Sequence, residues 1–139
     1  MKYRRFDNSV VLRLEIGEDI NEKLTELAEK ENISLASVSG IGATDDFTVG
    51  VFSLEKQNYE QFRFTGNHEI TALTGNISSM NGKAYVHTHI TCAGDGGKIV
   101  GGHLLKSRIS LTSEIFVSIV NGSADRVRDE ELKINLLSL

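Results

Sequence analysis

The sequence contains no proline, no tryptophan and a single cysteine, Cys92, among its 139 residues. One cysteine excludes an internal disulfide and a four-thiolate zinc ribbon, so any metal site in this chain must use other ligands. The absence of proline excludes polyproline ligand motifs. Together with the thirteen glycines, it indicates that the turns are made by residues with positive φ. These features favour a sheet-rich protein in a reducing compartment.

Long apolar runs and an excess of positive charge are also absent. No stretch approaches the roughly 18 apolar residues that a membrane span needs, and residues 1–7 lack the apolar segment of a secretion signal. We therefore expect a soluble, cytoplasmic protein. The 15 lysines and arginines are outnumbered by 19 aspartates and glutamates, giving a formal net charge of −4. Because duplex-binding domains carry a basic surface that neutralises phosphates, this balance disfavours non-specific DNA binding.

The pattern of apolar residues predicts one domain over residues 1–139, of the α+β class, with a mainly antiparallel sheet of about seven or eight strands. It has one clear amphipathic helix, to which short flanking helices can be added. The helix is expected within residues 18–32, where Ile20, Leu24, Leu27 and Ala28 share one face and Asn32 ends the pattern. The predicted strands are 9–16, 33–39, 47–54, 59–64, 70–79, 83–92, 98–105 and 109–120, and residues 132–137 could supply a last one. Between two of them, Asn81-Gly82 is typical of a type I′ hairpin turn.

The most informative segment is residues 85–90, with the sequence YVHTHI. In a strand, His87 and His89 project from the same face with Cα atoms roughly 6.5 to 7 Å apart. His103 follows beyond the glycine-rich turn at residues 93–97, and a hairpin would bring it back beside the pair. Neutral imidazole is the commonest protein ligand for zinc, so the three histidines form a candidate divalent metal site. For the fourth position we expect a carboxylate such as Glu114, or water.

The three histidines also allow an interpretation without a metal, and the other residues that could take part in a site are expected to have structural roles. His87 and His89 would also fit a sheet face that carries two solvated histidines, with His103 packed elsewhere. His68 is expected at the surface, and Cys92 has the wrong parity for the site and fits a small buried side chain. The mixed charges of residues 126–131 are typical of a solvated face.

Several segments, taken in order, resemble the PPC domain, the plants and prokaryotes conserved domain. The segments that carry the resemblance are the early strand and helix, VSGIGA at 38–43, EITALTGNI at 69–77, HTH at 87–89, VGGHL at 100–104 and TSEI at 112–115. The resemblance implies a compact α+β fold, with helices flanking an antiparallel sheet, that assembles as a homotrimer. In plant members the domain follows AT-hook motifs and mediates contacts with transcription factors. Prokaryotic members of this kind are bare domains labelled as DNA-binding, and they keep the histidines that correspond to His87, His89 and His103.

Three functions follow, in order of preference. The first is a homotrimeric regulatory module related to transcription that holds a divalent metal, zinc being expected, on the three histidines. The second is a metal-dependent hydrolase or lyase that acts on a small molecule at the same site, for which Glu69 or Glu114 would be the catalytic general base. The third is direct DNA binding, which the net charge makes the weakest of the three.

Overall fold

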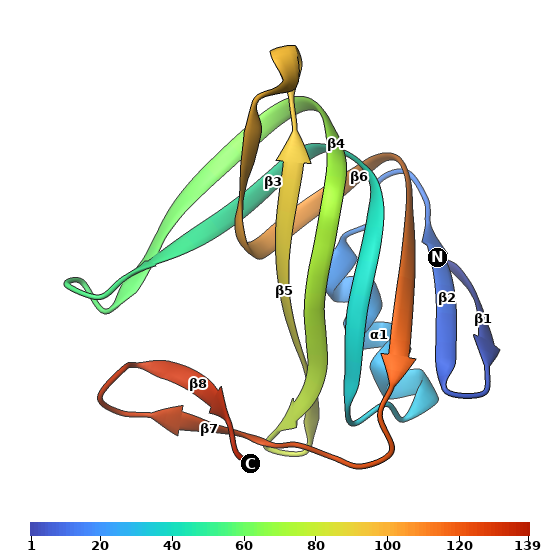
Figure 1. Ribbon diagram of the computed structural model, residues 1–139, viewed down its shortest axis with the longest axis vertical. Coiled ribbons are helices and arrows are strands. Elements are labelled where there is room, and N and C mark those ends of the chain that lie inside the picture. Colours follow the sequence, from blue (N-terminus) through green and yellow to red (C-terminus); the bar gives the residue numbers. More distant parts are fainter.

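The computed structural model describes all residues, 1–139 (Figure 1). The elements in chain order are β1 (Lys2–Phe6), β2 (Ser9–Leu14), α1 (Ile20–Glu31), β3 (Ala36–Ser53), β4 (Asn58–Met80), β5 (Lys83–Ala93), the 3₁₀ turn η1 (Asp95–Gly97), β6 (Ile99–Ile119), β7 (Arg126–Asp129) and β8 (Ile134–Leu137). Eight strands and one α-helix confirm the predicted α+β class, whereas the expected additional flanking helices are absent, since α1 is accompanied only by the three-residue turn η1. No helix is long and apolar enough to cross a membrane.

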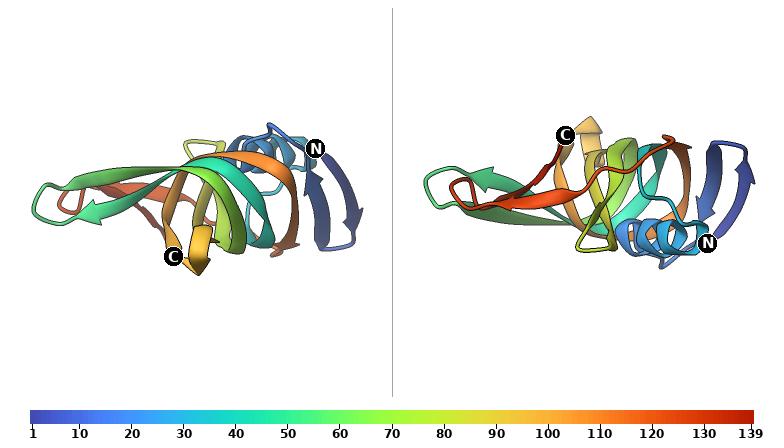
Figure 2. Two further views of the ribbon diagram at one scale, coloured as in Figure 1. Left: turned by 90° about the horizontal axis from the view of Figure 1, so that it is seen from above. Right: turned by 90° about the horizontal axis from the view of Figure 1, so that it is seen from below.

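Helix α1 forms where the apolar period predicts it. Asp19 precedes it as the N-cap and accepts a hydrogen bond from the backbone N–H of Glu22 at 2.9 Å. Asn32 adopts the left-handed conformation, with φ of 53°, and ends the helix. The buried residues are the four that the sequence predicts, Ile20, Leu24, Leu27 and Ala28. The helix lies against one face of the sheet, as the two views along the vertical axis show (Figure 2).

The main sheet is antiparallel throughout and partly closes on itself. Its strand order is β1-β2-β6-β3-β4-β5, and the first residues of β6 pair in addition with β5. Strands β3, β4, β5 and β6 therefore form a ring of hydrogen-bonded neighbours. One apolar cluster fills the space between this sheet and α1, with Leu24, Leu73, Ile90 and Ile115 among its fully buried members.

The strands differ from the prediction in length. Residues 33–39 and 47–54 were expected as two strands, but they belong to the single strand β3, which runs through Gly40 and Gly42. In the same way β4 and β6 each unite two predicted strands. Register shifts accompany the joins, for example between Gly40 and Gly42 and between Thr44 and Asp46. A bulge of this kind bends a strand without ending it, so the glycine and polar clusters mark bends here and not loops.

The two ends of the chain add short hairpins. Strand β1 was not predicted, and it pairs with β2 through a turn at Asp7, whose φ is 47°. At the C-terminus, β7 and β8 form a separate two-stranded sheet that lies below the β3–β4 hairpin in Figure 1. Residues of this C-terminal hairpin line a cavity together with His87 and His103 of the main sheet.

Candidate metal centre and adjoining cavity

The hairpin of β5 and β6 brings the three histidines together. His89 lies directly opposite His103 in the strand register, and His87 is two residues before His89 on the same face. One ring nitrogen from each side chain lies within 4.8 Å of the others. The ring centroids are 4.9 to 5.3 Å apart. The convergence that the sequence predicts is therefore present, and the binding of a metal ion there remains a prediction.

Small residues allow the strands to approach closely at this point. A Cβ on Gly101 would lie 2.3 Å from the carbonyl oxygen of Ile90 on β5. On the other side of β5, a Cβ on Gly75 would lie 2.2 Å from the carbonyl oxygen of His87. Only glycine fits at such distances, so both residues hold the histidine-bearing strand in place.

His103 is the most enclosed of the three histidines. Its ring stacks on Tyr59 with centroids 4.9 Å apart, and its Nδ1 atom is buried without a hydrogen-bond partner. Burial lowers the pKa of His103 to about 4, with smaller contributions from His87, His89 and Arg126. Burial likewise lowers the pKa of His87, followed by the positive charge of Arg126. Both rings are therefore neutral at pH 7, which is the form that binds a metal.

The lowered pKa of His103 makes the stability of the metal-free protein depend on pH. The unfolded chain binds a proton at His103 near pH 6.5, whereas the folded chain does so only near pH 4. The contribution of the neutral His103 to the free energy of unfolding is therefore complete above pH 6.5 and is lost as the pH drops toward 4. Because the side chain is only partly buried, we expect the loss to be on the order of 1–2 kcal/mol.

Urea unfolding in EDTA at pH 7.5, 6.0 and 5.0 measures this loss. The His103→Gln variant has no group that titrates at this position, so its stability is expected to decline less over the same range. Equal declines in the two proteins would contradict the assignment of this pH dependence to His103.

Arg126 corrects the sequence analysis, which placed it on a solvated charged face. Its side chain is buried, with 7% of the residue exposed, and its guanidinium lies over the ring of Tyr85 at 4.7 Å. Nη2 donates to Asn76 Oδ1 at 2.8 Å and contacts Nδ1 of His87 at 3.3 Å. Arg126 follows His103 by 23 residues with no spacing pattern between them, so no sequence signal could have identified it. Tyr85, by contrast, shares the strand parity of His87 and could have been found.

A cavity of about 380 Å³ opens beside the histidines. Its wall includes His87 and His103 from the main sheet, and the C-terminal hairpin supplies the opposite side. The basic residues in the wall are Arg126, Arg128 and Lys133, and no aspartate or glutamate lines it. The candidate metal centre therefore adjoins an open, positively charged space.

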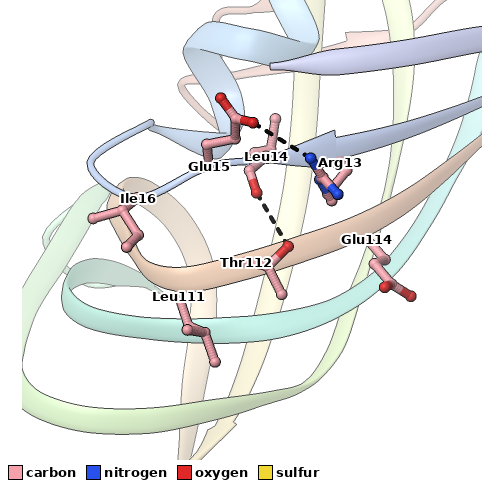
Figure 3. A pocket seen from close by; sticks show the side chains of 7 residues that line it. All are labelled: Arg13, Leu14, Glu15, Ile16, Leu111, Thr112 and Glu114. Atoms are coloured by element: carbon pink, nitrogen blue, oxygen red, sulfur yellow. Dashed lines mark hydrogen bonds and ion pairs between the residues drawn. The ribbon is translucent and has the colours of Figure 1, made fainter.

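The structure does not bring the two candidate carboxylates to the histidines. Glu114 lies on β6 opposite Ile41 and lines a different pocket, together with Arg13 and Leu111 (Figure 3). Glu69 lies opposite Ala93 and lines a third pocket. Within one chain, neither carboxylate is therefore placed to act as a general base beside the histidines. Glu114 is also not placed to be the fourth ligand, which leaves water, the other expected ligand, for that position.

The cysteine and the fourth histidine, neither of which was expected to be a ligand, also lie apart from the cluster. Cys92 is fully buried, as expected from its parity, and burial raises the pKa of its thiol to about 12, so it stays protonated. His68 was expected at the surface but is half-buried, edge-on to Phe47 at 5.2 Å, and its Nδ1 contacts the carbonyl oxygen of Gly66 at 2.8 Å.

The three histidines suit a zinc ion chemically. Three neutral imidazoles with a fourth position for water match a common zinc ligand set, and His103 carries a buried nitrogen with no other partner. Nitrogen ligands around a tetrahedral zinc are about 3.3 Å apart. In the structure the candidate ligand atoms lie within 4.8 Å of one another, so the longer separations would have to shorten by side-chain rotation when an ion binds.

Comparison with known proteins gives a family match and close structural similarity. Residues 1–121 match the family model of the Plants and Prokaryotes Conserved (PCC) domain. A protein from Bacteroides thetaiotaomicron, provisionally described as DNA-binding, is 28% identical with a TM-score of 0.95, over 99% of this chain and 96% of that one. A protein from Ralstonia eutropha with the same description is 29% identical with a TM-score of 0.92, over 99% and 96%.

A third similar structure bears on the histidines. It is a metal-containing protein from Archaeoglobus fulgidus, 30% identical to this chain with a TM-score of 0.88 over the full length of both chains. No curated protein sequence matches the chain. The family match confirms the resemblance seen in the sequence motifs.

Proposed function

The chain belongs to the Plants and Prokaryotes Conserved domain family, and from this premise we propose that it is a homotrimeric regulatory module with one divalent metal ion per chain, held by His87, His89 and His103. Zinc is the ion we expect. The observation that carries the proposal is the convergence of three ligand nitrogens within 4.8 Å, one of which is buried without any other partner. The metal-containing relative from Archaeoglobus fulgidus supports it.

Metal analysis of the untagged protein tests the metal site. The protein is purified without chelator, dialysed against metal-free buffer and measured by inductively coupled plasma mass spectrometry. We expect about one zinc ion per chain, retained through dialysis because three imidazoles bind it together. A negligible content of every divalent transition metal, together with no uptake of added zinc, would contradict the proposal.

An uncovered sheet face supports the homotrimer. Helix α1 packs on the face that contains Ile115 and Val117, so the opposite face has no covering layer within the chain. On that face Phe116 is 51% exposed and Ile41 is 57% exposed, on neighbouring strands. Large apolar side chains that gather on one face are typical of a protein interface.

Phe116→Glu is expected to dissociate the trimer, because it replaces an exposed apolar side chain of this face with a charge. Light scattering after size exclusion should give about three times 15.3 kDa for the unmodified protein and 15.3 kDa for the variant. Phe6→Glu is the matched control, since Phe6 is equally exposed but lies on the edge strand β1. A monomeric unmodified protein, or a trimeric Phe116→Glu variant, would refute this assignment.

Direct DNA binding is not part of the proposal, although two similar proteins are provisionally described as DNA-binding. The net charge of −4 disfavours neutralisation of phosphates. In gel shifts at physiological ionic strength we expect no retarded duplex up to about 100 μM protein. A salt-sensitive shift below that concentration would make DNA a ligand of the module.

A further inference from the structure

Arg126 is a buried cation without a counter-ion. Its residue is 7% exposed, and no carboxylate of the chain lies within ion-pair distance of it. Its hydrogen-bond acceptors are all neutral. They are Ser78 Oγ at 2.9 Å, the carbonyl oxygen of Asn135 at 2.8 Å and Asn76 Oδ1 at 2.8 Å, and Nη2 also contacts His87 Nδ1 at 3.3 Å. Removing a guanidinium from water is unfavourable unless an anion compensates its charge.

The surroundings of Arg126 do not provide that anion. Twelve residues line the adjoining cavity, and none of them is an aspartate or glutamate. Two further basic residues, Arg128 and Lys133, belong to the wall, and of these Lys133 is paired with Glu130 at 3.0 Å. A zinc ion on the histidines would add two more positive charges. The electrostatics of the cavity therefore select an anionic ligand.

We propose that this cavity binds a small organic carboxylate, whose carboxylate group pairs with Arg126 beside the three histidines. The inference deepens the proposed function and rests on it only for the part of the affinity that a metal ion would supply. Arg126 has a donor to offer, because a guanidinium has five N–H groups and its four contacts leave one unassigned. The longest of the four, to His87, is also the easiest to exchange.

The aromatic and aliphatic surfaces of the cavity wall favour a ligand with a hydrocarbon part in addition to its carboxylate. Tyr59 and Tyr85 offer aromatic surface, and Ile134, Leu136 and Leu137 offer aliphatic surface from β8. A cavity of about 380 Å³ with partly apolar walls and a buried basic anchor is of the size and kind that holds small organic ligands. An inorganic anion would satisfy Arg126 but would leave these walls in contact with water.

Benzoate and benzamide are suitable probes, because they have nearly the same shape and differ in charge. Isothermal titration calorimetry is carried out on the untagged oligomer, both zinc-loaded and stripped with EDTA, in buffer free of other carboxylates. We expect benzoate to bind the zinc-loaded protein in the millimolar range or tighter, and at least about tenfold more tightly than benzamide or inorganic phosphate.

Arg126→Gln is expected to weaken benzoate binding at least about tenfold, because a hydrogen bond between charged partners is lost, while zinc content stays the same. Arg63→Gln is the matched control, since Arg63 is an exposed arginine on β4 that pairs with Asp46 and does not line the cavity. Its benzoate binding is expected to equal that of the unmodified protein. Circular dichroism confirms that both variants fold. If Arg126→Gln does not fold, the comparison of benzoate with benzamide on the unmodified protein decides the question.

The outcomes separate this inference from the metal site. Equal binding of benzoate and benzamide, tighter binding of phosphate, or unchanged benzoate binding in a folded Arg126→Gln variant would each overturn the carboxylate site. Zinc-loaded protein that does not bind benzoate would overturn it too, as expected if a neighbouring subunit's carboxylate already pairs with Arg126. Metal-free protein that still binds benzoate through Arg126 would uphold the carboxylate site even if no metal binds.

Discussion

Replacing His103 with alanine is expected to reduce the zinc content of the purified protein from about one ion per chain to less than about 0.1. His103 is the ligand that β6 supplies, opposite His89, and without it the site keeps only two imidazoles from one strand. Two imidazole ligands, with water in the remaining coordination positions, bind zinc far more weakly than three imidazoles do. We expect the affinity for zinc to fall by more than about a hundredfold, measured by competition with a chromophoric chelator.

The chain offers a matched control for this prediction in its fourth histidine. His68 lies against Phe47, away from the cluster, so the His68→Ala variant loses an imidazole without losing a predicted ligand. Its zinc content and affinity are expected to equal those of the unmodified protein. Similar zinc contents in the His103→Ala and unmodified proteins, or a similar loss in both variants, would contradict the assigned ligand set.

Gly75→Val is expected to destabilise the protein by about 3–5 kcal/mol or to prevent folding. A Cβ at this position would lie 2.2 Å from the carbonyl oxygen of His87 and 2.8 Å from the Cα of Thr88. Both atoms belong to the backbone of β5, which pairs with β4 on one side and with β6 on the other, so it cannot yield by rotating a side chain. Urea unfolding of the metal-free protein measures the loss.

The neighbouring residue provides the control for Gly75→Val. Thr74 is exposed on the same strand, and Thr74→Val introduces the same side chain where there is space for it, so we expect a change within about 0.5 kcal/mol. Because Gly75 also fixes β5, any folded Gly75→Val protein should bind zinc more weakly. A variant as stable as the unmodified protein would show that β4 and β5 are not as close as the structure has them.

The histidine cluster could be predicted from the sequence because it depends on local rules. Strand parity places His87 and His89 on one face, and Asn81-Gly82 and the glycine-rich turn at residues 93–97 give two hairpins in a row. In the structure Asn81 and Gly82 have φ values of 54° and 74°, as a type I′ turn requires. The same regularity made α1 predictable, with its four buried residues and its end at Asn32.

The surroundings of the cluster could not be predicted, because they depend on contacts between distant segments. Arg126 enters the site only because the C-terminal hairpin folds back over β4 and β5, and a charged segment gives no sign of that. Glu114 was chosen by residue type, yet the bend in β6 carries it to another part of the sheet. Composition also could not reveal that Gly40 and Gly42 lie inside one long bent strand.

The central claim is that the three histidines bind one metal ion together, and zinc K-edge X-ray absorption on the untagged protein tests it most directly. The account predicts a four-coordinate zinc with Zn–N distances of about 2.0–2.1 Å and the multiple-scattering signature of about three imidazoles. Zinc that shows a sulfur shell at about 2.3 Å, or only oxygen ligands without imidazole scattering, would contradict it.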